Sequence, residues 1–181
     1  MVDQGNPSKE KIEKAFDDYS SLYDESTGES MVYLTNLMLR ETKIPKIPVC
    51  LDVASGTGIS TFELLKRCNG KGTFYGIDIS QSMIEIAENN ASKYGFTGIN
   101  FKKGDAEHLE FPDSMFDLVI CNMSFHFFPD KKKALSEMYR VLKPGGQVAL
   151  LYWGSVVFKR FQMQHLWWLV VTLSIRAFLM L

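Results

Sequence analysis

The residues best suited to chemistry lie between Val49 and Gly58, where a carboxylate precedes a glycine-containing turn. An apolar run ends at Asp52, and Gly56 and Gly58 follow before residues at helical spacing begin with Ile59. Glycine lets the backbone approach a ligand closely, and the first turn of a helix has unpaired N–H groups. The segment therefore predicts a strand, a tight turn and a helix that together bind a ligand.

This turn differs from two common nucleotide sites. The dinucleotide fingerprint G-x-G-x-x-G would need a third glycine where Thr61 stands, and a P-loop would need lysine where Ile59 follows Gly58. The carboxylate of Asp52 would also repel a pyrophosphate. A ligand that carries an ammonium group or another cation suits the turn better.

A second carboxylate, Asp78, ends the next apolar segment, 20 residues after Gly58. At about that distance, α/β dinucleotide sites place an acid on the ribose hydroxyls. A carboxylate accepts hydrogen bonds from both hydroxyls at once. The alternative is that Asp78 only begins the following helix, where acidic residues are favoured anyway.

Polar or small residues recur at the ends of four successive predicted strands. Asp52 with its glycines ends the first of these strands, and Asp78, Asp105 and Asn122 end the next three. The carboxyl ends of parallel strands meet at one edge of a sheet, where open α/β folds bind ligands. The pattern predicts that these side chains share one site.

The elements that must position these residues alternate regularly over about 100 residues, which predicts an α/β fold. We expect a doubly wound, mostly parallel, Rossmann-like sheet with helices on both faces and right-handed crossovers. The strands are expected to begin at Val49 and to cover 72–78, 99–103, 116–121 and 147–152, with helices from Ile59, Ser80 and Asp130 between them.

The chain is expected to divide into a helical cap or lid (1–48), a cofactor-binding core (49–154) and an atypical apolar tail (155–181). In the first part we expect a helix from Ser8, a polar loop from Ser20 to Ser30, and a second helix to Glu41. The first part either packs on the core as a cap or closes over the cofactor as a lid.

Composition narrows the classes of function. The chain has 181 residues, with 20 basic and 21 acidic side chains, so it can bury a core but offers no electrostatic attraction for nucleic acid. Cys50, Cys68 and Cys121 lack the spacing of metal ligands, so no metal site is expected. Their odd number indicates reduced thiols, and we expect a cytoplasmic protein without a signal peptide.

Together these segments resemble the class I S-adenosylmethionine-dependent methyltransferases. The nearest branch acts on small molecules and includes the quinone-biosynthesis methyltransferases, which the N-terminal Phe16 and Tyr23-Asp24 also resemble. The resemblance covers roughly residues 12–154. It rests on Leu51-Asp-Val-Ala-Ser-Gly-Thr-Gly58, Gly76-Ile-Asp-Ile-Ser80, Gly104-Asp-Ala-Glu107 and Leu142-Lys-Pro-Gly-Gly146.

The resemblance implies the cofactor S-adenosylmethionine, the product S-adenosylhomocysteine and a small-molecule methyl acceptor. It implies that Asp78 takes the ribose hydroxyls, that Asp105 accepts the exocyclic amine of adenine, and that Asn122 lies by the methionyl amine. Ala54 stands where many members have glycine. The implied cofactor-binding residues are Tyr23, Asp52, Ala54, Gly56, Gly58, Asp78, Ile79, Met83, Asp105, Ala106 and Asn122.

The sequence does not identify a catalytic residue. Methyl transfer from a sulfonium needs alignment of the reacting atoms, and it needs a base only if the acceptor must lose a proton. His126 is the best candidate for that base, but we favour a histidine that shapes the pocket or satisfies a backbone carbonyl. Phe125, Phe127 and Phe128 either line an acceptor pocket or belong to the core.

After Trp153-Gly154 the chain departs from the family pattern, and the C-terminal strands are expected to be incomplete. The tail is expected to pack on the core as one mostly helical element or to mediate self-association, and a truncated ending is a further interpretation. Its uncharged run 161–175 is shorter than the ~20 residues of a membrane-spanning helix. We therefore expect no spanning segment.

Two other functions compete with methyl transfer. A catalytically impaired, truncated module would bind S-adenosylmethionine and act by binding or self-association. A nicotinamide-dependent oxidoreductase is disfavoured by Thr61 and by Asp52.

Overall fold

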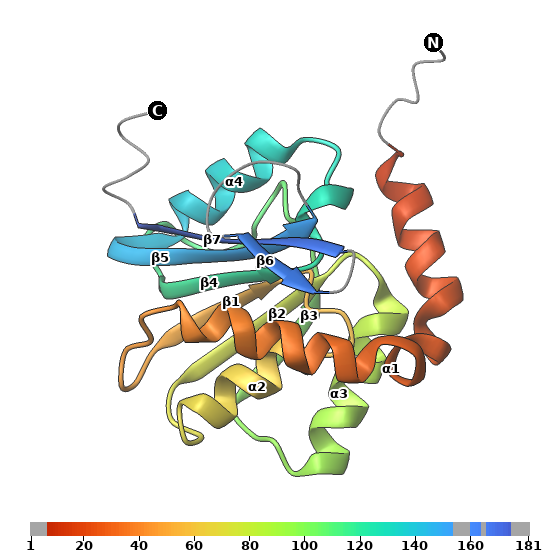
Figure 1. Cartoon of the computed structure of the whole chain (residues 1–181), viewed down its shortest axis with the longest axis horizontal. Coiled ribbons are helices and arrows are strands. Elements are labelled where there is room, and N and C mark those ends of the chain that lie inside the picture. The colour runs from red at the N-terminus through yellow and green to blue at the C-terminus, as the bar shows by residue number, and fades with distance from the viewer. Residues whose placement is uncertain (1–6, 154–159, 164–165, 175–181) are drawn as a thin grey trace.

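The computed structural model describes residues 7–153, 160–163 and 166–174, and within them the chain forms one seven-stranded sheet, in the order β3-β2-β1-β4-β5-β7-β6 (Figure 1). The first five strands are parallel, and β7 is antiparallel to β5 and to β6. The strands are β1 Val49–Val53, β2 Thr73–Asp78, β3 Ile99–Lys103, β4 Phe116–Asn122, β5 Leu142–Trp153, β6 Arg160–Met163 and β7 Leu166–Ser174.

The helices are α1 Lys9–Arg40, α2 Ile59–Arg67, α3 Gln81–Tyr94 and α4 Lys131–Arg140, with a short 3₁₀ turn, η1, at Phe125–Phe127. The predicted α/β Rossmann-like fold is therefore confirmed. No helix in the described part of the chain combines the length and hydropathy that crossing a membrane requires.

Alternate residues of the strands supply two separate halves of the core, because successive side chains of a strand point to opposite faces. On β1, Cys50 packs in the half that α1 and α2 cover, whereas Leu51 packs in the half that α4 covers. Cys50, Cys68 and Cys121 are all buried and form no disulfide, and burial raises the pKa of each thiol. They therefore act as packing groups.

The polar loop expected at residues 20–30 is wrong, because the structure has one continuous helix, α1, from Lys9 to Arg40. The hydroxyls of Ser26 and Thr27 donate to the carbonyls of Leu22 and Tyr23, one turn earlier, so these residues complete the helix. Hydroxyls that bond back in this way bend helices. Figure 1 shows that the red first part and the orange second part of α1 run in different directions.

The expected mostly helical tail is also wrong for the described residues beyond β5. Residues 160–163 and 166–174 form β6 and β7, and the pairing of β5 with β7 runs from Gln147↔Ser174 to Trp153↔Trp168. The C-terminal strands that were expected to be incomplete therefore cover the edge of β5. Residues 154–159, 164–165 and 175–181 lie outside the described residues.

Candidate functional site

A pocket lies at the carboxyl ends of β1, β2, β3 and β4, and the first part of α1 forms one of its walls. Most of the residues expected at the site line this pocket, whereas Asp52 and Gly58 do not. The expected residues that do line it are Tyr23, Ala54, Gly56, Asp78, Ile79, Met83, Asp105, Ala106 and Asn122.

The turn after β1 is held in a left-handed conformation at Ala54 (φ 59°), Gly56 (φ 53°) and Gly58 (φ 89°). A Cβ atom at Gly56 would meet nothing within 4 Å, so glycine there serves the backbone conformation and leaves space beside the pocket. A Cβ atom at Gly58 would lie 2.6 Å from the ring of Phe62. Gly58 is therefore required by packing against α2 as well as by its φ.

Asp78 fastens this turn to the end of β2. Its Oδ2 accepts a hydrogen bond from Gly56 N at 2.8 Å, and its Oδ1 accepts one from Ser80 N at 2.9 Å. Burial raises the pKa of Asp78, against the lowering effect of these backbone N–H groups. Each carboxylate oxygen keeps a second lone pair for a hydroxyl donor in the pocket.

Asp52 lies behind the turn, 2 % exposed, rather than on the pocket surface. Its Oδ2 accepts a hydrogen bond from Thr61 Oγ1 at 2.7 Å, and its Oδ1 has no partner within the described residues. Burial raises the pKa of Asp52 to about 7, and Asp78 adds to the rise while the Thr61 hydroxyl opposes it. An unpartnered buried carboxylate is a place where a cation nearby would be favoured.

Asn122 belongs to a buried polar group that joins three elements. Its Nδ2 donates to Thr35 Oγ1 of α1 at 2.9 Å and to Ser60 Oγ of α2 at 3.1 Å. These bonds orient the amide so that Oδ1, which has no partner among the described residues, remains as an acceptor. Asn122 thus presents an acceptor suited to an amine donor.

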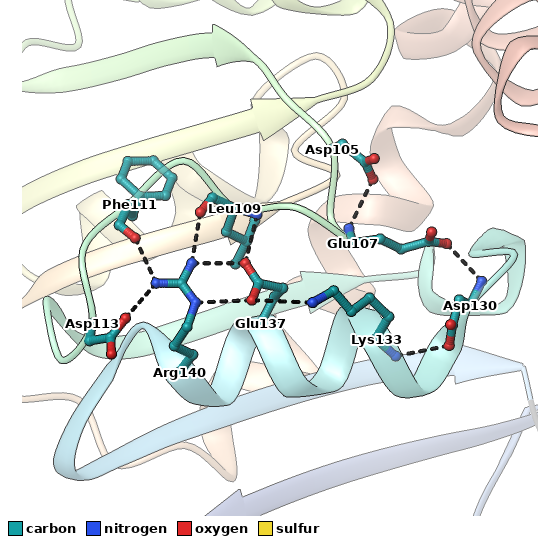
Figure 2. A network of polar contacts seen from close by, with 9 residues as sticks. All are labelled: Asp105, Glu107, Leu109, Phe111, Asp113, Asp130, Lys133, Glu137 and Arg140. Atoms are coloured by element: carbon teal, nitrogen blue, oxygen red, sulfur yellow. Dashed lines mark hydrogen bonds and ion pairs between the residues drawn. The ribbon is translucent and has the colours of Figure 1, made fainter.

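The segment after β3, which carries Asp105, is fixed to α4 by the network that Figure 2 shows. Glu137, 6 % exposed, accepts hydrogen bonds from Leu109 N and from both Nε and Nη2 of Arg140. The guanidinium also donates to the carbonyls of Leu109 and Phe111. The side chain of Arg140 therefore holds this segment in place through charge-assisted bonds.

Replacing Glu137 with alanine is expected to lower the free energy of unfolding by about 2–4 kcal/mol, because the change leaves Leu109 N without its acceptor and removes the buried carboxylate that Arg140 Nε and Nη2 bond. Hydrogen bonds from Arg140 lower the pKa of Glu137 to about 2, from an ordinary 4.5. Glu137 therefore stabilises the fold above pH 4.5, and its contribution is lost as pH falls toward 2. Denaturant unfolding of Glu137→Ala at pH 7 and pH 3 tests this prediction, with Lys132→Ala on the same helix as the control. Equal losses in the free energy of unfolding for the two variants at pH 7 would contradict it.

The other end of the pocket is apolar. Phe16 of α1 meets Phe127 edge to face, with ring centroids 5.3 Å apart, and Ile12, Phe128 and Pro129 complete this wall. His126 does not line the pocket, and its ring lies against Phe127 with centroids 4.1 Å apart. Burial lowers the pKa of His126, and Lys131 lowers it further. The location favours a histidine that shapes the pocket over a base that reaches a ligand.

Several residues at this site had no assigned role from the sequence. Lys9 and Glu107 line the pocket, and Asp17 of α1 accepts hydrogen bonds from Ser80 Oγ and Ser82 N. Glu107 lies in a segment that the sequence singled out beside Asp105, so its neighbourhood was predictable. No sequence pattern indicated Lys9 or Asp17, since their partners lie more than 60 positions away.

The arrangement suits a particular ligand chemistry. Asp78 offers acceptors for hydroxyls, Asn122 offers its amide oxygen, and Asp105 adds a second carboxylate to the pocket lining. Asp52 adds a carboxylate behind the turn. The aromatic wall offers apolar contact for a second molecule. A ligand with hydroxyls, an amine and a positive charge fits the residues present.

Comparison with known proteins gives a consistent family. A family model described as a methyltransferase domain matches residues 47–165. Demethylmenaquinone methyltransferase of Anoxybacillus flavithermus is 31% identical over 147 residues, which cover 79% of this chain and 62% of that protein. The ubiquinone/menaquinone biosynthesis C-methyltransferase UbiE of Hydrogenovibrio crunogenus is 34% identical, covering 83% of this chain and 62% of that protein. The chain thus spans less than two thirds of the length of these relatives.

Solved structures show the same architecture. An S-adenosylmethionine-dependent methyltransferase from Aquifex aeolicus superposes with a TM-score of 0.63 at 27% identity, covering 81% of this chain and 73% of that one. The [4+2]-cyclase SpnF superposes with a TM-score of 0.75 at 24% identity, covering 82% of this chain and 61% of that one, which shows a shared fold alone. A fold does not by itself fix an activity.

Proposed function

The chain belongs to the S-adenosylmethionine-dependent methyltransferase family, and from this membership we propose that it moves the cofactor's methyl group to a small apolar acceptor. The observation that carries the proposal is the convergence of Asp78, Asp105 and Asn122 on one pocket. S-adenosylmethionine supplies an electrophilic methyl group on a positively charged sulfur. The chain must bind it, align it with the acceptor and exclude water.

We assign the following roles to the residues of the pocket. Asp78 accepts the ribose hydroxyls while it holds the turn through Gly56 N. Asp105 accepts the exocyclic amine of adenine, and Ile79, Met83 and Ala106 pack beside the ring. Asn122 Oδ1 accepts the methionyl amine, and Asp52 favours the positive charge from behind the turn without direct contact. Ala54 and Gly56 leave room for the methionine part, and Tyr23 closes over it.

The aromatic wall of Phe16, Phe127 and Phe128 supports an acceptor with a flat apolar ring. Two of the relatives are named for the methylation of quinone precursors, and we propose a quinol of this kind as the acceptor class. In this proposal the aromatic wall aligns the nucleophilic atom of the acceptor with the methyl group, which is a proximity effect. His126 shapes the wall from behind.

The test combines binding with transfer. Calorimetric titration is expected to show binding of S-adenosylmethionine and of S-adenosylhomocysteine but not of NAD. Label from the methyl group is expected to enter a demethylated quinol presented in detergent micelles. Phe16→Ala should reduce transfer to the quinol more than it reduces cofactor affinity, whereas Tyr33→Ala, an exposed aromatic change elsewhere on α1, should alter neither. Cofactor binding without transfer to any quinol would favour the non-catalytic binding module, and absence of cofactor binding would overturn the proposal.

A further inference from the structure

A positively charged side chain of the protein lies inside the proposed cofactor pocket. Lys9, in the first turn of α1, lines the pocket together with Asp105 and Glu107. Its Nζ is 2.6 Å from Asp105 Oδ2 and 2.6 Å from Glu107 Oε2. The side chains of Lys9 and Asp105 are each 34% exposed, so the pair is only partly screened by solvent.

The two carboxylates are held in place from behind. Asp105 Oδ1 accepts Glu107 N at 2.9 Å, and Glu107 Oε1 accepts Asp130 N at 2.7 Å, as Figure 2 shows. Each acid therefore uses one oxygen to fix its orientation and turns the other toward Lys9. Burial of Lys9 would lower its pKa, but the hydrogen bonds to the two acids outweigh this and raise it.

The part of α1 that carries Lys9 is attached to the core by several polar contacts and by the edge-to-face contact of Phe16 with Phe127. We call residues 9–24 the amino-terminal limb of α1. Glu13 pairs with Lys103, Asp17 accepts from Ser80 and Ser82, and Asp24 accepts from Thr57 and Asn90. The fully buried apolar residues of α1, by contrast, are Leu34, Met38 and Leu39, beyond the bend.

From these contacts we propose that Lys9 is an autoinhibitory latch for the cofactor site. Its ammonium contacts Asp105 Oδ2, the oxygen that Glu107 N does not use, and so competes there with the exocyclic amine that the proposed function assigns to Asp105. The cofactor then binds fully only as this ion pair opens and the amino-terminal limb shifts. The inference rests on the proposed function, because it assigns a regulator to the same site. The latch predicts that the unaltered protein binds its cofactor more weakly than a variant without the ion pairs of Lys9.

The test is calorimetric titration of Lys9→Met with S-adenosylhomocysteine, which lacks the sulfonium charge and so reduces general electrostatic effects. We expect the affinity to rise about fivefold, because the two partly exposed ion pairs of Lys9 no longer compete with the ligand. Lys14→Met is the matched control, because it removes the same charge from the same helix, where Lys14 pairs with the exposed Asp18 one turn away. The control should bind as the unaltered protein does.

Two further readouts separate a latch from a change of charge. Raising the salt concentration from about 0.05 M to about 0.5 M should strengthen binding to the unaltered protein and leave Lys9→Met nearly unchanged, because salt screens partly exposed pairs. Backbone amide exchange in residues 9–16 should be faster in Lys9→Met than in Lys14→Met without ligand. Equal or weaker binding by Lys9→Met would overturn the latch while leaving the proposed function intact. Failure of all variants to bind would overturn the proposed function itself.

Discussion

Replacing Asp52 with asparagine is expected to stabilise the free protein at pH 8, although Asp52 belongs to the cofactor motif. Burial raises the pKa of Asp52 from 3.8 to about 7. The folded state therefore keeps a proton that the unfolded state releases, and stability falls as pH rises from about 4 to about 7. At ~1.4 kcal/mol per pKa unit, the ionised carboxylate costs the fold roughly 4 kcal/mol at pH 8. Asparagine has the same shape without the charge.

Denaturant unfolding at pH 5 and at pH 8 measures this effect. The unaltered protein should lose more stability between the two values than Asp52→Asn does. Asp18→Asn, which removes an exposed carboxylate from α1, is the control and should follow the unaltered protein. A variant that loses stability at pH 8 relative to the unaltered protein would show that the charge of Asp52 is balanced in the free protein.

The same variant is expected to bind S-adenosylmethionine about tenfold more weakly, because a unit charge about 10 Å away contributes about 1–2 kcal/mol at an effective dielectric near 20. Binding of S-adenosylhomocysteine should weaken less, since it lacks the sulfonium. For the unaltered protein, affinity for the cation should rise with pH through the pKa of Asp52, as the carboxylate ionises. Equal losses for both ligands would remove Asp52 from any role toward the sulfonium.

Replacing Asp78 with alanine is expected to weaken cofactor binding by about 1–3 kcal/mol, the order for the loss of charged hydrogen bonds. The change also leaves Gly56 N and Ser80 N without their acceptor, so the turn after β1 loses its tie to β2. Thermal unfolding should also show that the free energy of unfolding falls by about 1–3 kcal/mol, because two buried or partly buried N–H donors lose their acceptor. Titration of S-adenosylhomocysteine and a melting curve measure the two effects separately.

Asp78→Asn keeps this test decisive if the alanine variant is too unstable to titrate. The amide oxygen of asparagine can accept a hydrogen bond from one of the two backbone N–H groups. The free energy of unfolding should therefore fall less than the free energy of cofactor binding does. Glu85→Ala, an exposed acid on α3, is the control for charge near the site. Unchanged affinity in a folded Asp78→Asn variant would exclude Asp78 from the ribose role.

The parallel core was predictable because its elements are encoded locally. Phe116–Asn122 is apolar apart from Asp117 and the final Asn122, and Ser80, where a helix was expected to begin, caps α3 by accepting a hydrogen bond from Met83 N. The turn after β1 was equally predictable, since glycine readily adopts the positive φ angles that Gly56 and Gly58 have there. The local sequence pattern gave the wrong prediction at residues 20–30. There the hydroxyls of Ser26 and Thr27 donate to carbonyls within the helix, and Asp24 accepts a hydrogen bond from Thr57.

The sequence by itself determined which chemistry the site presents, because Asp78, Asp105 and Asn122 follow strands whose parallel order brings them to one edge. Tertiary structure alone decided that Asp52 lies behind the turn rather than on the pocket surface. It also decided that Lys9 meets Asp105, 96 positions away, and that residues 160–163 and 166–174 pair as strands. Contacts over such separations depend on how the elements pack, and neither periodicity nor residue spacing records that packing.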